Sequence, residues 1–220
     1  MKDVELRVLR DPTAYAAELL AEAASPGGHL ALSGGSTVGP AYELAARLQP
    51  RWRDTQVWFG DERAVPPDDE RSNYRLVHTT LLDALAVTPR VHRVQGELPA
   101  VEAAAVYAEE LDGVVLDLAL NGIGSDGHTA SLFPGSEALE ERERRVVAAE
   151  PGLEPFVSRV TMTPPVFAAA KLLVYLVTGE EKAGAVRRAL AEEPSPATPA
   201  SLVRGKATIA LLDEAAAALL

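Results

Sequence analysis

The sequence predicts an α/β fold in which a mostly parallel sheet carries a small antiparallel insertion. Short apolar runs alternate with helical patterns along the chain, as expected of successive βα units. The chain has 220 residues, of which 47% are hydrophobic and 24% charged. This is enough apolar material for the core of one domain. We therefore expect a single α/β domain over residues 1–220.

The first half of the chain alternates strand and helix signals. Asp11 is an expected N-cap, and Pro12 the expected first helical residue, of a helix over 11–24. A short buried strand at 29–35 runs into a glycine turn. The later elements of this half are expected in the order helix 39–48, strand 55–62 ending in acids, helix 73–85 and helix 99–111.

The second half holds the expected antiparallel insertion. Residues 113–130 form a strand, a glycine-rich turn and the start of a helix, and segments 145–150 and 157–163 pair as the insertion. A helix begins at Pro164. The remaining elements are expected as strand 172–179, helix 180–193, strand 207–213 and a last helix over 214–220.

Charge and composition exclude several classes of function. The net charge of −11 argues against binding to nucleic acid or an anionic membrane surface. The chain has no cysteine, no uninterrupted apolar run of about 18 residues and no secretory signal pattern at its start. We expect a soluble cytoplasmic protein. A small anionic ligand would need a local cluster of donors to offset the overall negative field.

The first motif is Ser33-Gly34-Gly35-Ser36-Thr37, between a strand and a helix. Its glycines let the backbone approach an anion, its hydroxyls can donate to one, and the next helix directs free N–H groups towards it. The motif matches neither the Walker pattern nor the dinucleotide fingerprint. A phosphate cradle and a plain tight turn both remain open.

The second motif is Gly60-Asp61-Glu62-Arg63, at the end of the strand over 55–62, with Ser72-Asn73 opening the next helix. Acids exposed at a strand end suit proton transfer or the orientation of a histidine, and an adjacent arginine can hold a substrate oxygen. The alternative is a solvated charge cluster in which Asn73 is only an N-cap.

The third motif runs from Gly122 to Gly135 and places His128 one residue after a glycine turn, at the expected start of a helix. A histidine held there by the backbone suits a general base, although an ordinary cap or surface role remains open. His29, His78 and His92 are expected to be structural. No histidine pair has a metal-ligand spacing, so no metal is expected.

Two basic residues complete the candidate site. Arg159 lies in the strand predicted at 157–163, and Lys182 lies in the first turn of a helix. A lysine near a helix N-terminus is unfavourable for the helix dipole, so an anionic partner would account for it. A solvent-exposed lysine without a ligand is the simpler alternative.

Together the motifs LSGGST, FGDERAVP with SNY, GIGSDGHTASLFPG, SRVTMT and VTGEEKAGAV resemble, in content and order, those of the 6-phosphogluconolactonases, within the glucosamine-6-phosphate isomerase/6-phosphogluconolactonase family. The match spans essentially the whole chain, and its most specific part is DGHTASLFPG. Asn121 departs from the family pattern, which usually has an aliphatic residue or glycine there.

The resemblance implies a modified Rossmann-like three-layer fold, a site without a cofactor, and hydrolysis of 6-phosphogluconolactone to 6-phosphogluconate in the pentose phosphate pathway. We expect His128 to take a proton from the attacking water. Asp61 or Asp126 would orient its ring, and Arg63 or turn amides would stabilise the oxyanion. The residues expected to bind substrate or phosphate are Ser33, Gly34, Gly35, Ser36, Thr37, Asn73, Arg159 and Lys182. The protein is expected to be a monomer or small homo-oligomer.

Two alternatives differ from this hypothesis. The deaminases of the same family carry a catalytic glutamate where this chain has Phe133 and a tyrosine where it has Arg63, which argues against amino-sugar isomerisation. A non-catalytic sugar-phosphate sensor is the other alternative, because a phosphate cradle alone does not make an enzyme. A sensor would not need a base such as His128.

Overall fold

The computed structural model describes residues 4–24, 28–152, 154 and 156–220. Its main sheet has seven strands in the order β1-β10-β9-β6-β2-β3-β5, and all neighbouring pairs are parallel. The strands are β1 (Glu5–Val8), β2 (His29–Leu32), β3 (Gln56–Phe59), β5 (Arg90–Val91), β6 (Leu118–Asn121), β9 (Leu172–Val177) and β10 (Ala207–Leu212). The predicted parallel sheet is confirmed.

The predicted antiparallel insertion is also confirmed, and it is larger than expected. A second sheet has the order β4-β8-β7, with both pairs antiparallel. Its strands are β4 (Asp61–Arg63), β7 (Val146–Ala149) and β8 (Arg159–Met162). The pair β7 and β8 was expected, whereas β4 was expected to continue β3.

The chain changes from one sheet to the other at Gly60. The Gly60 N–H donates to the Leu32 carbonyl of β2 at 2.9 Å, and the Gly60 carbonyl accepts from Met162 N–H of β8 at 2.8 Å. The single strand expected over 55–62 is therefore wrong. Gly60 ends its pairing with the main sheet and begins that with the small one, so Asp61 and Arg63 belong to the second sheet.

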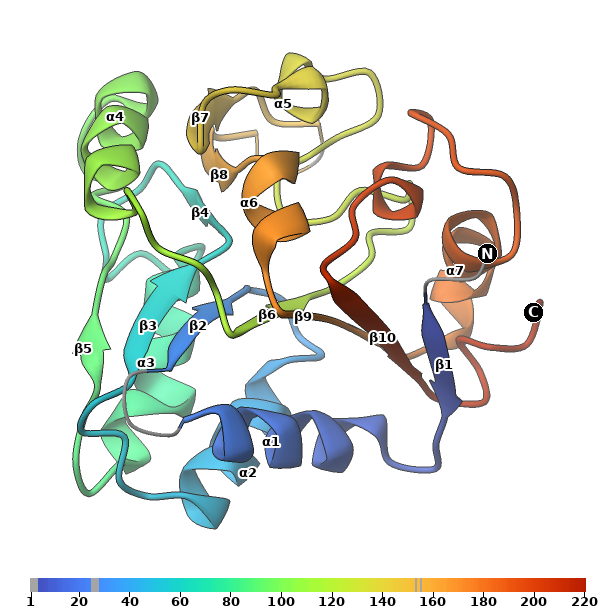
Figure 1. Ribbon diagram of the computed structural model, residues 1–220, viewed down its shortest axis with the longest axis horizontal. Coiled ribbons are helices and arrows are strands. Elements are labelled where there is room, and N and C mark those ends of the chain that lie inside the picture. The colour runs from blue at the N-terminus through green and yellow to red at the C-terminus, as the bar shows by residue number, and fades with distance from the viewer. Residues whose placement is uncertain (1–3, 25–27, 153, 155) are drawn as a thin grey trace.

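Helices cover both sides of the main sheet and complete a layered α/β architecture (Figure 1). In the view of Figure 1, α1 and α2 lie below the sheet, while α6 and the small sheet lie above it. The helices are α1 (Pro12–Ala23), α2 (Gly39–Leu48), α3 (Asn73–Thr80), α4 (Ala100–Glu110), α5 (Glu137–Glu140), α6 (Pro164–Ala169) and α7 (Ala183–Leu190), with short 3₁₀ turns at Leu82–Ala84, Glu180–Lys182 and Pro199–Ser201.

Local sequence explains most helix boundaries. The Asp11 side chain accepts from Ala14 N–H at 2.9 Å and caps α1, with Pro12 at its first position, as predicted. The Ser72 side chain caps α3 by accepting from Arg75 N–H. Helix α3 ends at Thr80 instead of residue 85, because the chain continues into the 3₁₀ turn at Leu82–Ala84.

Two expected helices are absent from the described residues. No helix starts near Ala130, because Gly127 and Ala130 have φ of 93° and 48°, which are incompatible with a right-handed helix. The first helix after β6 is α5. Residues 214–219 form turns where a last helix was expected over 214–220.

Buried tyrosines fix the ends of two central strands, where the site lies. The Tyr42 hydroxyl of α2 accepts from Ser33 N–H at 3.0 Å and donates to the Ser33 carbonyl at 2.7 Å. The Tyr107 hydroxyl of α4 accepts from Phe59 N–H at 2.7 Å. Both rings are almost fully buried, so each strand end has a fixed position against a helix. Within the described part of the chain, no helix combines the length and apolar character needed to cross a membrane.

Candidate active site

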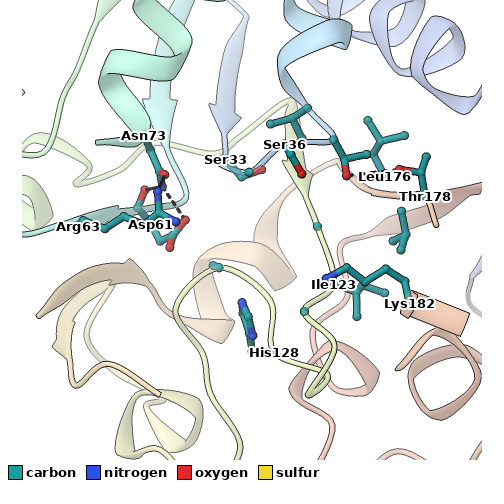
Figure 2. Close-up of a pocket in the computed structure, with 18 residues that line it drawn as sticks. Ser33, Ser36, Asp61, Arg63, Asn73, Ile123, His128, Leu176, Thr178 and Lys182 are labelled. Carbon is teal, nitrogen blue, oxygen red and sulfur yellow. Dashed lines mark hydrogen bonds between the residues drawn. The ribbon is translucent and has the colours of Figure 1, made fainter. Parts of the chain in front are cut away.

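A cavity of about 210 Å³ opens beyond the carboxyl ends of four neighbouring strands, β9, β6, β2 and β3. In parallel α/β sheets this edge is where ligands bind. Figure 2 shows Asp61, Arg63 and Asn73 on one side of the cavity, Thr178 and Lys182 on the other. Each part of its wall follows a different strand, so the sheet determines their relative positions.

His128 faces this cavity and pairs with Asp126. Its Nδ1 lies 2.6 Å from Asp126 Oδ1, and its backbone N–H donates to the same oxygen at 3.0 Å. A carboxylate can only accept, so Nδ1 carries the proton and Nε2 is left as the basic nitrogen. The His128 side chain is 25% exposed, which leaves its ring accessible from the cavity.

The Asp126 carboxylate is held in its charged form by His128. Burial favours the neutral acid, but the hydrogen bonds from the His128 ring and backbone outweigh it and lower the pKa of Asp126 below its ordinary value. Of the two acids that sequence reasoning left open for orienting the histidine, Asp126 is the one in contact with it. Asp61 is held by other groups.

Gly124 makes the close approach of His128 and Asp126 possible. A Cβ on Gly124 would lie 2.1 Å from His128 Nδ1 and 2.7 Å from Asp126 Oδ1. Gly124 N–H also donates to the His128 carbonyl, and Gly127 N–H to the Gly124 carbonyl, both at 2.9 Å. The loop therefore closes on itself around a position at which only glycine fits.

Asp61 is buried and hydrogen-bonded at the opposite wall. Its Oδ2 accepts from Ser131 Oγ at 2.7 Å, while its backbone carbonyl and Oδ1 accept from Asn73 Nδ2 at 2.8 and 3.2 Å. Asn73 Oδ1 in turn accepts from Arg63 Nη1 at 2.5 Å. Ser131 is 1% exposed and does not line the cavity.

Glu62 has a structural role, contrary to the expectation that the acids of this motif are exposed. It is 2% exposed, and its carboxylate accepts from the N–H groups of Arg63, Asn73 and Tyr74 at 2.7 to 2.8 Å. Burial raises the pKa of Glu62, and these backbone hydrogen bonds offset part of the effect. Glu62 thus binds the N-terminus of α3 and places Asn73 at the cavity.

The loop after β2 forms the roof of the cavity. Ser33 to Thr37 line it, and helix α2 starts two residues later, with no side chain capping its N-terminus. A Cβ on Gly34 would lie 1.8 Å from Asn73 Oδ1, so glycine is required there too. Thr178 Oγ1 contacts Thr37 Oγ1 at 3.4 Å, which joins this loop to the end of β9.

The predicted site residues lie close together, and all but two of them line the cavity. All of them line the cavity except Asp126, which contacts His128 from behind, and Arg159. Arg159 is 4% exposed in β8, paired across the small sheet with Arg63. Burial and the charge of Arg63 lower the pKa of Arg159, while Asp61 and Glu62 raise it. Arg159 is therefore a buried cross-strand neighbour of Arg63 that does not line the cavity.

Comparison with known proteins agrees with this geometry. The family model for glucosamine-6-phosphate isomerases/6-phosphogluconolactonase matches residues 6–211. The chain belongs to this family. The resemblance predicted from the motifs is confirmed.

The relatives compared below are 6-phosphogluconolactonases, one of the two kinds of enzyme named in the family's description. Human 6-phosphogluconolactonase is 41% identical over 210 residues, which cover 87% of this chain and 80% of the human protein. The 6-phosphogluconolactonase of Haemophilus influenzae is 35% identical over 207 residues, covering 87% of each chain. The solved 6-phosphogluconolactonase structure from Trypanosoma cruzi has a TM-score of 0.86 at 28% identity and covers 100% of this chain and 97% of its own.

The family fold is also shared with a deaminase. A monomeric glucosamine-6-phosphate deaminase has a TM-score of 0.86 at 23% identity, covering 99% of this chain and 100% of its own. At that identity the likeness shows the fold alone. The choice between the two chemistries of the family depends on individual residues.

Several residues that line the cavity were given no individual role from the sequence. They are mostly apolar and follow strand ends, a position that marks ligand contacts in such sheets. These lining residues are Val38 and Leu176, with Gly122, Ile123, Gly124 and Ala130 of the third motif and Val177 and Thr178 of the motif VTGEEKAGAV. Asn121, which departs from the family pattern, is fully buried, and its Nδ2 donates to Thr129 Oγ1 at 3.2 Å. It supports the His128 loop from the end of β6.

Proposed function

We propose that this protein hydrolyses 6-phospho-D-glucono-1,5-lactone to 6-phospho-D-gluconate, with His128 as the general base. The observation that carries the mechanism is the His128–Asp126 pair, which leaves Nε2 of a partly exposed imidazole as the proton acceptor at the cavity. Nε2 takes a proton from the water that attacks the lactone carbonyl, and returns it to the departing ring oxygen.

Asp126 orients the imidazole and stabilises its charged form when the proton arrives. A strained ester such as a δ-lactone needs only base catalysis and positioning, so no covalent intermediate is required. Arg63 is assigned to the developing oxyanion. It lines the cavity, and its buried Nε has no hydrogen-bond partner among the described residues. A donor left in that state is suited to a ligand oxygen.

The phosphate group is assigned to the loop over residues 33–37 and to Lys182. Helix α2 begins beside this loop without a capping side chain, so its N–H groups are available to an anion. Ser33 Oγ is buried without a partner among the described residues. Lys182 lies on the far wall, directly before α7. Arg159, the cross-strand neighbour of Arg63, adds positive charge close to the cavity.

Two side chains, Phe133 and Arg63, argue for the lactonase over the deaminase of the same family. Phe133 is 6% exposed, and its ring centroid lies 4.8 Å from that of His128, where the deaminase pattern has a catalytic glutamate. Arg63 replaces the deaminase tyrosine. A sensor without activity has no use for the aligned Asp126 and His128. A coupled assay with fresh 6-phosphogluconolactone, corrected for spontaneous hydrolysis, separates these functions when glucosamine 6-phosphate is run in parallel.

The biological setting is proposed on the same basis. We assign the protein to the cytoplasm and to the oxidative branch of the pentose phosphate pathway. Residues 1–220 are proposed to act as a single domain, as a monomer or small homo-oligomer, without a nucleic-acid partner or cofactor. Size-exclusion chromatography with light scattering measures the oligomeric state.

Lys182→Ala should raise KM for the phosphorylated lactone about tenfold, the lower end of what a hydrogen bond to a charged group contributes, because Lys182 is only partly buried. Part of the loss will appear in kcat, since phosphate binding also positions the lactone ring. Arg159→Ala should weaken binding less, because Arg159 does not line the cavity. If Lys182→Ala had the KM of the parent, the phosphate would not bind at Lys182.

Exhaustive EDTA treatment should leave full activity. No group of three His, Asp or Glu side chains in the described residues is placed to hold a metal ion, and the proposed chemistry uses only side chains. The measurement is the initial rate before and after chelation, with added Mg²⁺, Mn²⁺ and Zn²⁺ as controls. Activity that is lost and then restored by a metal would contradict the mechanism.

A further inference from the structure

The loop that carries His128 belongs to no helix or strand. The carbonyls of Gly124, Ser125, Gly127 and His128 nevertheless all accept hydrogen bonds. Two are satisfied inside the loop, since the Gly124 carbonyl accepts from Gly127 N–H and the His128 carbonyl from Gly124 N–H. The carbonyls of Ser125 and Gly127 accept from outside it. These two flank Asp126, the residue that orients the proposed base.

The two outside donors come from the C-terminal part of the chain. Arg188, in the last turn of α7, donates from Nη2 to the Ser125 carbonyl at 2.9 Å. Ala200, in the 3₁₀ turn Pro199–Ser201, donates from its N–H to the Gly127 carbonyl at 2.9 Å. Gly127 also packs closely on Thr198, because a Cβ there would lie 2.8 Å from Thr198 Cγ2.

Arg204 joins these two donors into one unit. Its Nη2 donates to the Ala189 carbonyl of α7 at 3.1 Å, and its Nη1 to the Val203 carbonyl at 2.8 Å and to the Ala200 carbonyl. The segment 195–204 and α7 are therefore tied together behind the loop. A catalytic side chain on an irregular loop needs such outer support, because small displacements reduce the rate strongly.

We propose that Arg188 is a positioning residue for His128. It lies outside the cavity lining and acts through Ser125, which precedes Asp126. By holding that carbonyl, the guanidinium keeps the Asp126 carboxylate where it meets Nδ1 at 2.6 Å. The catalytic part of this inference rests on the proposed role of His128 as base, whereas the structural part does not.

The neighbouring Arg187 provides a matched control. It shares the last turn of α7 and pairs with Glu192 at 3.0 Å, with its side chain 54% exposed. Both arginines are favourable near the negative end of the helix dipole. Only Arg188, of these two, donates to the His128 loop. A difference between their variants thus measures the contact with Ser125 and excludes a general effect of charge.

The kinetic test uses Arg188→Met, Arg188→Lys and Arg187→Met. Methionine keeps most of the apolar stem but has no donor, whereas lysine restores a positively charged donor group. We expect Arg188→Met to lower kcat about tenfold, less than the roughly hundredfold cost of a 1 Å misplacement, with KM within about twofold. Arg188→Lys should recover most of kcat, and Arg187→Met should match the parent.

The second readout does not depend on turnover. In protein labelled with ¹⁵N-histidine, the Nδ1 proton of His128, assigned by its absence in His128→Asn, reports the short hydrogen bond to Asp126. Arg188→Met should broaden or shift this signal, while Arg187→Met leaves it in place. An unchanged signal together with parental kcat in Arg188→Met would overturn the inference. A changed signal in a protein without lactonase activity would support the positioning role and refute the proposed function instead.

Discussion

His128→Asn should remove most of the catalysed rate while leaving the binding of 6-phosphogluconate largely intact. Asparagine keeps a similar shape and some hydrogen bonding, but its amide cannot accept a proton near neutral pH. Only the step that needs a base is lost. General-base contributions are typically on the order of 10² to 10⁴ in rate. The matched control is His78→Asn in α3, whose imidazole pairs with Asp83 away from the cavity and should be dispensable.

The measurement is kcat and KM across pH, corrected for spontaneous hydrolysis, with Kd of 6-phosphogluconate for the variant. Parental activity should fall on acidification, because protonation removes the acceptor at His128 Nε2. Asp126 does not cause this loss. The pKa of Asp126 lies below its ordinary value, so its carboxylate stays ionised through mild acid and is neutralised only at lower pH. General-base catalysis contributes on the order of 10² to 10⁴ in rate. If kcat of His128→Asn were within about threefold of the parent, His128 would therefore be excluded as the base.

Gly124→Ala should lower kcat about a hundredfold, the cost of displacing a reacting group by about 1 Å. The new Cβ would lie 2.1 Å from His128 Nδ1 and 2.2 Å from its Cε1, so the ring has to leave its present position. The hydrogen bond to Asp126 is lost with it. The substitution does not touch residues 33–37 or Lys182, to which we assign the phosphate, so KM should change much less than kcat.

Gly39→Ala is the control for this substitution. Gly39 begins α2, and a Cβ there would meet Leu76 and Thr80 of α3 at an ordinary 3.7 Å. We expect parental kcat for this variant. The Nδ1 proton signal of His128 should disappear in Gly124→Ala and persist in Gly39→Ala. If Gly124→Ala kept the parental rate, His128 would not act from the position seen in the structure.

The parallel sheet and most helix starts could be predicted from the sequence because their causes are local. Asp11 and Pro12 fix the start of α1, and buried apolar runs mark the central strands. The change of sheet at Gly60 could not be predicted. The run from Gln56 to Arg63 has strand character throughout, and only the pairing of Gly60 with both Leu32 and Met162 separates its two halves.

The errors at helices have equally specific causes. A helix was expected to start after Gly127, but positive φ at Gly127 and Ala130 turns the chain away from a helix. His128 therefore does not lie at the start of a helix, as was expected. At the other end of the chain, the alanine-rich stretch 214–220 follows Asp213, whose carboxylate accepts from Gly179 and Ala216 N–H groups. The stretch after Asp213 nevertheless forms turns over residues 214–219.

The candidate site was predicted at the level of residue types, and less well at the level of contacts. Motifs at strand ends identified nearly all polar residues of the cavity, because strand ends converge in a parallel sheet. Sequence spacing could not distinguish Asp61 from Asp126 as the partner of His128. It also could not show that Arg159 pairs with Arg63 and stays outside the cavity lining. Those outcomes depend on side-chain packing between segments far apart in the chain, such as Ser131 against Asp61.

The cavity draws its walls from loops that follow separate strands, and this has a consequence for how the family diversifies. The wall with Asp61 and Arg63 follows β3, whereas Thr178 and Lys182 follow β9, on the other side of β2 and β6. A substitution in one of these segments leaves the main sheet that positions them intact, so one side chain of the cavity can be exchanged without loss of the fold. Evolution can therefore change the reaction at this sheet edge in single steps, each starting from a protein that still folds.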